Sequence, residues 1–76
     1  MAWRTYTPDG RTLEVECLED GVWVAVCESG TATGTTPAEA MREALGMEPA
    51  LGASPGALAA WIDERAAQYE RELGSH

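Results

Sequence analysis

The stretch of sequence that decides the fold runs from Arg11 to Leu45 and reads RTLEVECLEDGVWVAVCESGTATGTTPAEAMREAL. Two segments with alternating apolar and polar residues, 11–19 and 22–29, flank the Asp-Gly dipeptide at 20–21. Asp-Gly between two such segments is a strong signal for a two-residue β-hairpin turn. We therefore expect an antiparallel hairpin, then a candidate short strand at 31–33, and then a helix.

A second hairpin is expected just before this one. Residues 7–11 (TPDGR) place Pro and Asp at the centre of a type I turn and Gly10 in the left-handed position of a bulged three-residue hairpin. This turn predicts the pairs Tyr6 with Thr12, Arg4 with Glu14, and Trp3 with Val15. The turn at 20–21 predicts the pairs Cys17 with Val24, Val15 with Val26, and Leu18 with Trp23. The two registers agree on which residues share a face of the sheet.

The two faces of this predicted sheet differ in composition. One face is apolar and should form the core: Trp3, Leu13, Val15, Cys17, Val22, Val24 and Val26. The other face is mixed: Arg4, Tyr6, Glu14, Glu16, Leu18, Trp23, Ala25 and Cys27. Aromatic side chains beside charges are typical of protein interfaces. An Arg4–Glu14 pair, however, is equally typical of a solvated sheet face. Both interpretations of the second face stay open.

The first helix has a nearly complete start signal. Thr36 is a suitable N-cap, Pro37 occupies the first helical position, and Glu39 is placed to complete a capping box. We expect this helix over 36–46, with Gly46 as its terminator. Its apolar stripe consists of Ala40, Met41, Ala44 and Leu45 and should cover the core face of the sheet.

A second helix is expected over 54–73, after a loop that begins at Met47. Ser54 and Pro55 repeat the start signal of the first helix. The apolar stripe of this helix consists of Leu58, Trp61, Ile62, Ala66, Tyr69 and Leu73. At this length the helix would extend roughly 30 Å. Its distal end, with Tyr69 and Leu73, either overhangs the sheet and pairs with another molecule or folds back onto its own core.

Together these elements predict a single small α+β domain over 1–76. A three-stranded antiparallel meander over 1–33, with the candidate fourth strand, is packed by the two helices in the order β-β-β-α-α. A chain of 76 residues is near the lower limit for one unaided core. The sequence shows no signal-peptide pattern and no apolar run of membrane-spanning length, so we expect a cytoplasmic protein.

The charge of the chain restricts its partners. Thirteen acidic residues face five arginines, and the formal net charge is −8. Nucleic-acid affinity comes largely from Lys and Arg side chains that displace counterions, so direct binding to nucleic acid is not expected. An acidic surface suits a basic protein partner, although the same charge would also serve to keep a small protein soluble.

Residues that would support catalysis or metal binding are missing from the pattern. The predicted register places Cys17 and Cys27 on opposite faces, so both should be free thiols. The single histidine, His76, is the last residue, which leaves no Ser/His/Asp or Cys/His arrangement in its usual form. Glu14 and Glu16 share a face but are best explained as solvated strand carboxylates. We expect no enzymatic activity, no metal and no cofactor.

The segment 12–45 resembles the HicB-like antitoxin family. The similarity comprises a strand, an acidic-Gly turn, the alternating strand DGVWVAV at 20–26, a small polar strand, and the helix entry GTTPAEAMREAL at 34–45. Thr35 stands where the family usually has Asp, and Ala38 where it often has Glu. The resemblance implies a β-β-β-α fold and a protein that binds and blocks a small basic toxin that cleaves mRNA. The family's usual DNA-binding extension is not visible in this sequence.

Two hypotheses for function follow. The first is a non-enzymatic inhibitor whose acidic surface occupies the nucleic-acid site of a basic partner, either as an antitoxin or as a phage-type inhibitor of a CRISPR effector. The second is a structural or oligomerisation module that uses the last helix as the seam of a homodimer. The candidate partner-binding residues are Tyr6, Glu14, Glu16, Leu18, Glu19, Asp20, Trp23 and Glu28. A candidate second interface comprises Asp63, Glu64, Tyr69, Glu70, Glu72 and Leu73.

Overall fold

The computed structural model describes residues 2–19, 21–28, 30–46 and 54–74. The elements in chain order are β1 (Ala2–Tyr6), β2 (Thr12–Glu19), β3 (Val22–Cys27), β4 (Gly30–Gly34), α1 (Pro37–Leu45) and α2 (Pro55–Gly74). The strands form one sheet in the order β1-β2-β3-β4, and every neighbouring pair is antiparallel. The predicted α+β class is therefore confirmed, and the candidate fourth strand is present. Most of the predicted loop, 47–53, lies outside the described residues.

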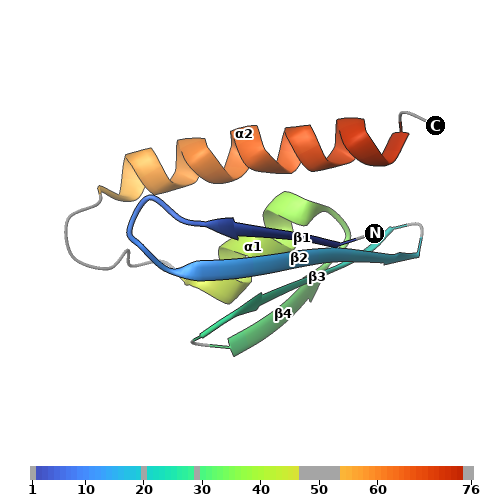
Figure 1. Cartoon of the computed structure of the whole chain (residues 1–76), viewed down its shortest axis with the longest axis horizontal. Coiled ribbons are helices and arrows are strands. Elements are labelled where there is room, and N and C mark those ends of the chain that lie inside the picture. Colours follow the sequence, from blue (N-terminus) through green and yellow to red (C-terminus); the bar gives the residue numbers. More distant parts are fainter. Residues whose placement is uncertain (1, 20, 29, 47–53, 75–76) are drawn as a thin grey trace.

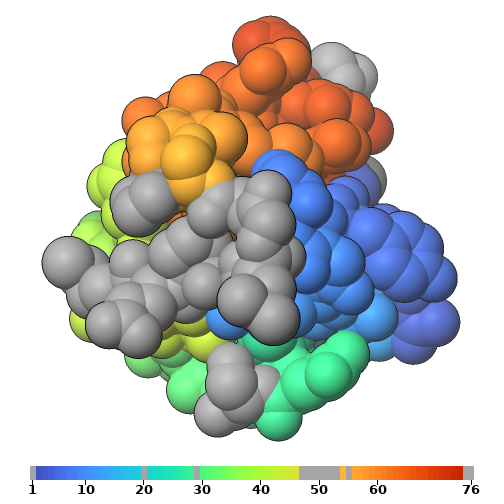
Figure 2. Space-filling view, turned by 90° about the vertical axis from the view of Figure 1, so that its left-hand side faces the viewer, coloured from blue at the N-terminus to red at the C-terminus, as the bar shows by residue number. Residues whose placement is uncertain are grey.

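The two helices leave one face of the sheet uncovered. Figure 1 shows α1 crossing behind the strands, while α2 runs along the length of the sheet beside β1. In the end-on view of Figure 2, α2 (orange) lies at one side of the molecule and the green residues that follow β3 lie at the other. Residues on β2 alternate between buried and exposed, as expected when only one face of a sheet is packed. Neither described helix combines the length and apolar content needed to cross a bilayer.

The first hairpin forms as the sequence predicts. Tyr6 pairs with Thr12, Arg4 with Glu14, and Trp3 with Val15. The backbone N–H of Gly10 donates to the Thr7 carbonyl at 3.0 Å, and Gly10 adopts a φ of +87°. Glycine adopts the left-handed conformation required at this position without steric cost, so Gly10 identifies the turn in the sequence.

The register predicted for the second hairpin is wrong by one residue. The structure pairs Val15 with Ala25 and Cys17 with Trp23, and the register shifts between Cys17 and Glu19. This irregularity is a β-bulge, which inserts an extra residue into one strand of a pair. Because side chains alternate with a period of two, a shift of one residue moves every side chain of β3 to the opposite face.

The corrected register changes which residues of β3 form the core. Trp23, Ala25 and Cys27 are buried, whereas Val24 is half-buried and Val26 is exposed. The prediction that Val22, Val24 and Val26 face the core and Trp23 faces solvent is therefore wrong. The observed register buries the larger apolar surface of Trp23, which stacks on the half-buried Trp3 with ring centroids 5.8 Å apart.

The helices begin and end as their caps indicate. Thr36 Oγ1 accepts a hydrogen bond from the Glu39 N–H at 3.1 Å, and the Gly46 N–H donates to the Arg42 carbonyl at 2.9 Å. A capping box would also have the Glu39 carboxylate accept from the Thr36 N–H, but here that carboxylate accepts a hydrogen bond from Thr35 Oγ1. For α2, Ser54 Oγ accepts from the Ala57 N–H at 3.1 Å.

Both apolar helix stripes pack against the sheet. Ala40, Met41, Ala44 and Leu45 of α1 are all buried, as predicted. In α2, the buried residues are Leu58, Ile62, Ala66 and Tyr69, with Trp61 and Leu73 partly buried against the same core. The distal part of α2 therefore folds back onto its own domain, and the alternative in which Tyr69 and Leu73 overhang is wrong.

Candidate protein-binding face

The uncovered side of the sheet forms the largest candidate site, which we call the open face. Residues opposite one another in the register share this face, so two complete rows cross all four strands. The first row is Ala2, Glu16, Val24 and Thr33, and the second is Arg4, Glu14, Val26 and Thr31. Tyr6 and Thr12 add a partial third row, whereas the exposed Leu18 has no partner in the register because it lies within the bulge of β2.

Exposed apolar side chains are concentrated on the open face. In the described part of the chain, the large hydrophobic residues that remain exposed are Tyr6 (69%), Leu18 (57%) and Val26 (42%). Tyr6 and Val26 belong to this face and Leu18 lies within the bulge of β2, whereas the apolar stripes of both helices are buried or partly buried. Grouped apolar exposure of this kind, with polar residues around it, is typical of a surface that binds another protein.

Carboxylates of β2 divide the open face along its length. Glu14 and Glu16 are both exposed and lie between the Arg4 side of the sheet and the valines of β3. Arg4 Nε donates to Glu14 Oε1 at 3.0 Å. The hydrogen bond and the negative charge of Glu14 raise the pKa of Arg4. Within the described residues Glu16 makes no ion pair, so the face carries a local negative charge.

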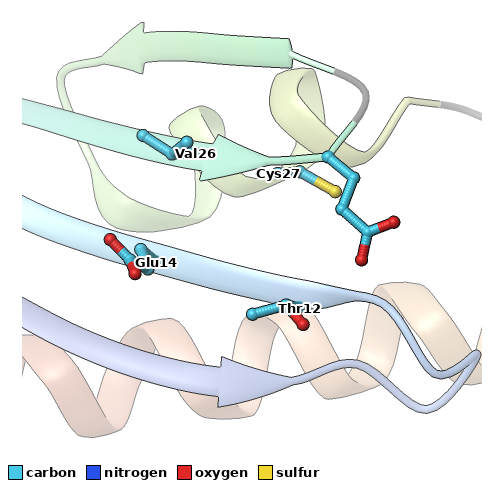
Figure 3. A pocket seen from close by; sticks show the side chains of 5 residues that line it. Thr12, Glu14, Val26 and Cys27 are labelled. Atoms are coloured by element: carbon cyan, nitrogen blue, oxygen red, sulfur yellow. The ribbon is translucent and has the colours of Figure 1, made fainter.

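A shallow hollow of about 250 Å³ lies at one end of the open face. It is lined by Thr12, Glu14, Val26, Cys27 and Glu28. Figure 3 shows Thr12 and Glu14 on β2 facing Val26 on the neighbouring strand, with Cys27 at the end of that strand. Two carboxylates therefore border a floor formed partly by an aliphatic side chain.

Most of the predicted partner-binding residues of the hairpin are brought together. Tyr6, Glu14 and Glu16 lie on the open face, and Leu18, Glu19 and Glu28 are exposed toward the ends of β2 and β3. Trp23 was expected beside them, but it is only 4% exposed and belongs to the core. Asp20 lies outside the described residues.

The predicted second interface on α2 is not assembled as expected. Asp63, Glu64, Glu70 and Glu72 are exposed, but Tyr69 is 2% exposed and Leu73 is partly buried. Asp63 accepts a hydrogen bond from Arg42 of α1, and Gln68 donates to Glu72. The exposed part of α2 is therefore mainly charged and lacks the two apolar residues that were expected to anchor a partner.

Sequence reasoning missed the residues that the bulge moves onto the open face. The sequence predicts Val24 and Val26 in the core, whereas the bulge places them on the open face; Thr12 and Cys27, which line the hollow, are not among the predicted site residues. The bulge has no glycine or proline that would reveal it, because it lies within 17–19, where the residues are Cys, Leu and Glu. The burial preference of Trp23 was the one available signal, since tryptophan carries the largest apolar surface on that strand.

The side chains that could bind a metal ion are not clustered in the part of the chain that is described. No group of three or more His, Cys, Asp or Glu residues there is placed to hold a metal ion. Cys17 and Cys27 are free thiols, as predicted. The expectation that they lie on opposite faces is wrong, because they are opposite Trp23 and Leu13 on the core face.

Comparisons with known proteins add no relative. No family model matches the chain, and neither a curated protein nor a solved structure matches it closely enough to indicate a common family. The resemblance of 12–45 to HicB-like antitoxins therefore stays a prediction.

Proposed function

We propose that this chain is a small, non-enzymatic inhibitor that binds a basic protein through the open face and keeps that protein from its nucleic acid. The observation that carries the proposal is that, among the described residues, the exposed large hydrophobic side chains Tyr6 and Val26 lie on one uncovered sheet face beside carboxylates, with Leu18 exposed at the bulge of β2. A partner that covers this face would remove these side chains from water, which is the main favourable term in most protein association.

Charge gives the partner its expected character. The net charge of −8 attracts basic proteins over a distance and accelerates their encounter. Charged groups alone seldom provide high affinity, because the loss of their hydration offsets much of their attraction. The open face supplies both parts, since its carboxylates can steer a partner and its apolar residues can anchor it.

The biological form of the inhibitor is proposed from the same chemistry. A toxin that cleaves mRNA and a CRISPR effector both present basic nucleic-acid sites, and an acidic face can occupy either. The resemblance to HicB-like antitoxins favours the toxin. A small basic toxin gene next to this gene would support that form, and phage genes or a CRISPR locus would support the other.

Burial of the apolar stripe of α2 disfavours the alternative of an oligomerisation module. Its seam was to be the apolar stripe of α2, but Tyr69 is buried and Leu73 partly buried within the same domain. The exposed side of α2 that remains for a dimer carries more carboxylates, Asp63, Glu64, Glu70 and Glu72, than arginines. Like charges at that interface oppose association.

A matched pair of double variants tests the proposal. Glu14→Gln/Glu16→Gln removes two charges from the open face, and Glu64→Gln/Glu70→Gln removes two from α2. Each variant and the wild-type chain are used to capture partners from the native host, and association rates are then measured at low and high salt. We expect a basic, nucleic-acid-binding partner that associates more slowly with the open-face variant only, with a difference that shrinks in high salt.

Two results would contradict the proposal. One is equal, salt-independent binding by both double variants, since the carboxylates of the open face would then have no part in recognition. The other is a partner that binds this protein and its nucleic acid at the same time, which would show that the face does not occupy the nucleic-acid site. Competition between labelled nucleic acid and this protein for the captured partner measures the second point directly.

A further inference from the structure

The ion pair between Arg4 and Glu14 lies directly beside the hollow. Arg4 approaches Glu14 from β1, and the hollow lies on the other side of Glu14, toward Val26 of β3. Both side chains of the pair remain largely in solvent, with 68% of the Arg4 side chain and 50% of the Glu14 side chain exposed. Both hydrogen bonds from Arg4 reach the same carboxylate oxygen, Oε1. The second oxygen of Glu14 therefore keeps its capacity to accept a hydrogen bond.

The lining of the hollow suits a basic side chain with a long apolar stem. Val26 and Thr12 offer aliphatic contact for methylene groups, while Glu14 and Glu28 provide carboxylates at the border. Arginine fits this arrangement better than lysine, because its planar guanidinium can donate to two carboxylates and packs well on flat surfaces. Arg11 interacts electrostatically with Glu28, but its guanidinium already donates hydrogen bonds to Asp9 and to the Leu45 carbonyl.

We infer that the hollow receives an arginine side chain of the basic partner, and that Arg4 is an internal competitor for Glu14. This inference rests on the proposed function and specifies how the same face recognises its partner. In the free protein Arg4 partly neutralises Glu14. When a partner arginine lies on Val26 with its guanidinium between Glu14 and Glu28, it shares or replaces the Arg4 contact. Removal of Arg4 should therefore strengthen binding, although it deletes an interaction seen in the structure.

The chain offers a closely matched control for this test. Arg42 and Asp63 form a second exposed ion pair between α1 and α2, with side chains 55% and 60% exposed. Arg4→Gln and Arg42→Gln each remove one positive charge and each release one exposed carboxylate. Any general effect of a more negative protein is thus common to both variants, and only Arg4→Gln changes the hollow.

The probe is a blocked Gly-Arg-Gly tripeptide, compared with the same tripeptide carrying citrulline, which has a similar shape without the charge. Binding to the full chain is followed by amide chemical shifts in NMR spectra. We expect saturable shifts at Thr12, Val26 and Glu28 with the arginine peptide, and much smaller shifts with citrulline. Arg4→Gln should bind the arginine peptide severalfold more tightly, while Arg42→Gln should bind it like the wild-type chain at these residues.

The inference is overturned if both variants change binding equally, or if Arg4→Gln weakens it. It is also overturned if the shifts follow Asp63 and Glu64 as strongly as the hollow, because the peptide would then bind negative charge in general. These outcomes leave the proposed function intact, since that function is judged by the captured partner and the double variants. Conversely, loss of discrimination by the double variants would refute the proposed function even if the peptide bound in the hollow.

Discussion

Trp3 on β1 and Tyr69 on α2 stack with their ring centroids 4.7 Å apart and their planes 19° from parallel. The contact attaches the end of the long helix to an edge strand more than sixty residues earlier in the chain. Trp3 also stacks on Trp23, so three aromatic rings connect β3, β1 and α2. This arrangement explains why α2 is held along the sheet rather than projecting from it.

The first prediction concerns the Tyr69 hydroxyl. Burial raises the pKa of Tyr69 above its usual value of 10.0, although the charge of Arg65 and a hydrogen bond with Thr5 partly oppose the shift. Because the pKa of Tyr69 is higher in the folded state than in the unfolded state, the contribution of this group to stability is complete below pH 10. The contribution is lost as the pH rises through the folded-state pKa. Chemical denaturation at a series of alkaline pH values should show this decline, and Tyr69→Phe should remove it.

A second titration isolates the group responsible. In a Tyr6→Phe background, the phenolate absorbance of the native protein reports Tyr69 alone, because the chain has two tyrosines. Ionisation at the pH of an ordinary tyrosine in the folded protein would contradict the predicted shift. Tyr69→Phe should also cost about 1 kcal/mol at neutral pH from the lost hydrogen bond with Thr5.

The second prediction tests the corrected register of β3. Trp23→Ala should destabilise the protein by about 3–5 kcal/mol, which is comparable with the entire stability of a small domain. Val24→Ala, the neighbouring substitution on the open face, should cost less than about 1 kcal/mol. Urea denaturation of both variants measures the difference. The reverse order would mean that the sheet follows the register without the bulge.

The third prediction compares the ion pair of Arg4, on β1, with that of Arg11, which directly precedes β2. Arg11 donates to both carboxylate oxygens of Asp9 and also to the Leu45 carbonyl, and the Asp9 side chain is fully buried. Arg11→Ala leaves that carboxylate without its main cation and should cost about 3 kcal/mol. Arg4→Ala removes an exposed pair and should cost less than about 1 kcal/mol. Equal losses in thermal or urea unfolding would show that burial does not distinguish the two pairs.

The fourth prediction concerns the cysteines. Cys27 lies opposite Leu13, four positions along β2 from Cys17, so the two are separated by roughly 13 Å. A disulfide needs Cα atoms within about 7 Å, and mild oxidation should therefore not form an intramolecular bond. A thiol reagent should modify Cys17 faster than Cys27 in the folded protein, because Cys27 is 7% exposed and Cys17 is half-buried. Mass spectrometry after oxidation and after labelling checks both statements.

Local signals in the sequence predicted those parts of the fold that are decided by backbone chemistry. Gly10 marked a turn that needs a positive φ, and Thr36, Pro37 and Gly46 marked the ends of α1, because each satisfies a specific backbone requirement. The position of β4 and the apolar stripe of α2 followed from similar reasoning. These features depend on residues close together in the chain.

The register of β3 and the composition of the candidate site depend on contacts that are distant in sequence. The turn at 20–21 indicates a hairpin but does not reveal that β2 gains an extra residue at 17–19. That choice is made by the packing of Trp23 against Trp3 and the helices, which no local pattern contains. Glu14 and Glu16 of β2 precede the bulge, and the sequence predicts them correctly on the open face. Val24 and Val26 are predicted on the wrong face because the bulge shifts the register of β3.

The open face also has a consequence for how the protein behaves at high concentration. At neutral pH the net charge of −8 makes separate molecules repel one another, which offsets the attraction between their exposed Tyr6, Leu18 and Val26 side chains. Near the isoelectric point of about 4.3 this repulsion disappears while the apolar surface remains. Solutions should then become turbid or scatter light strongly, and acidification offers a simple way to concentrate and recover the protein.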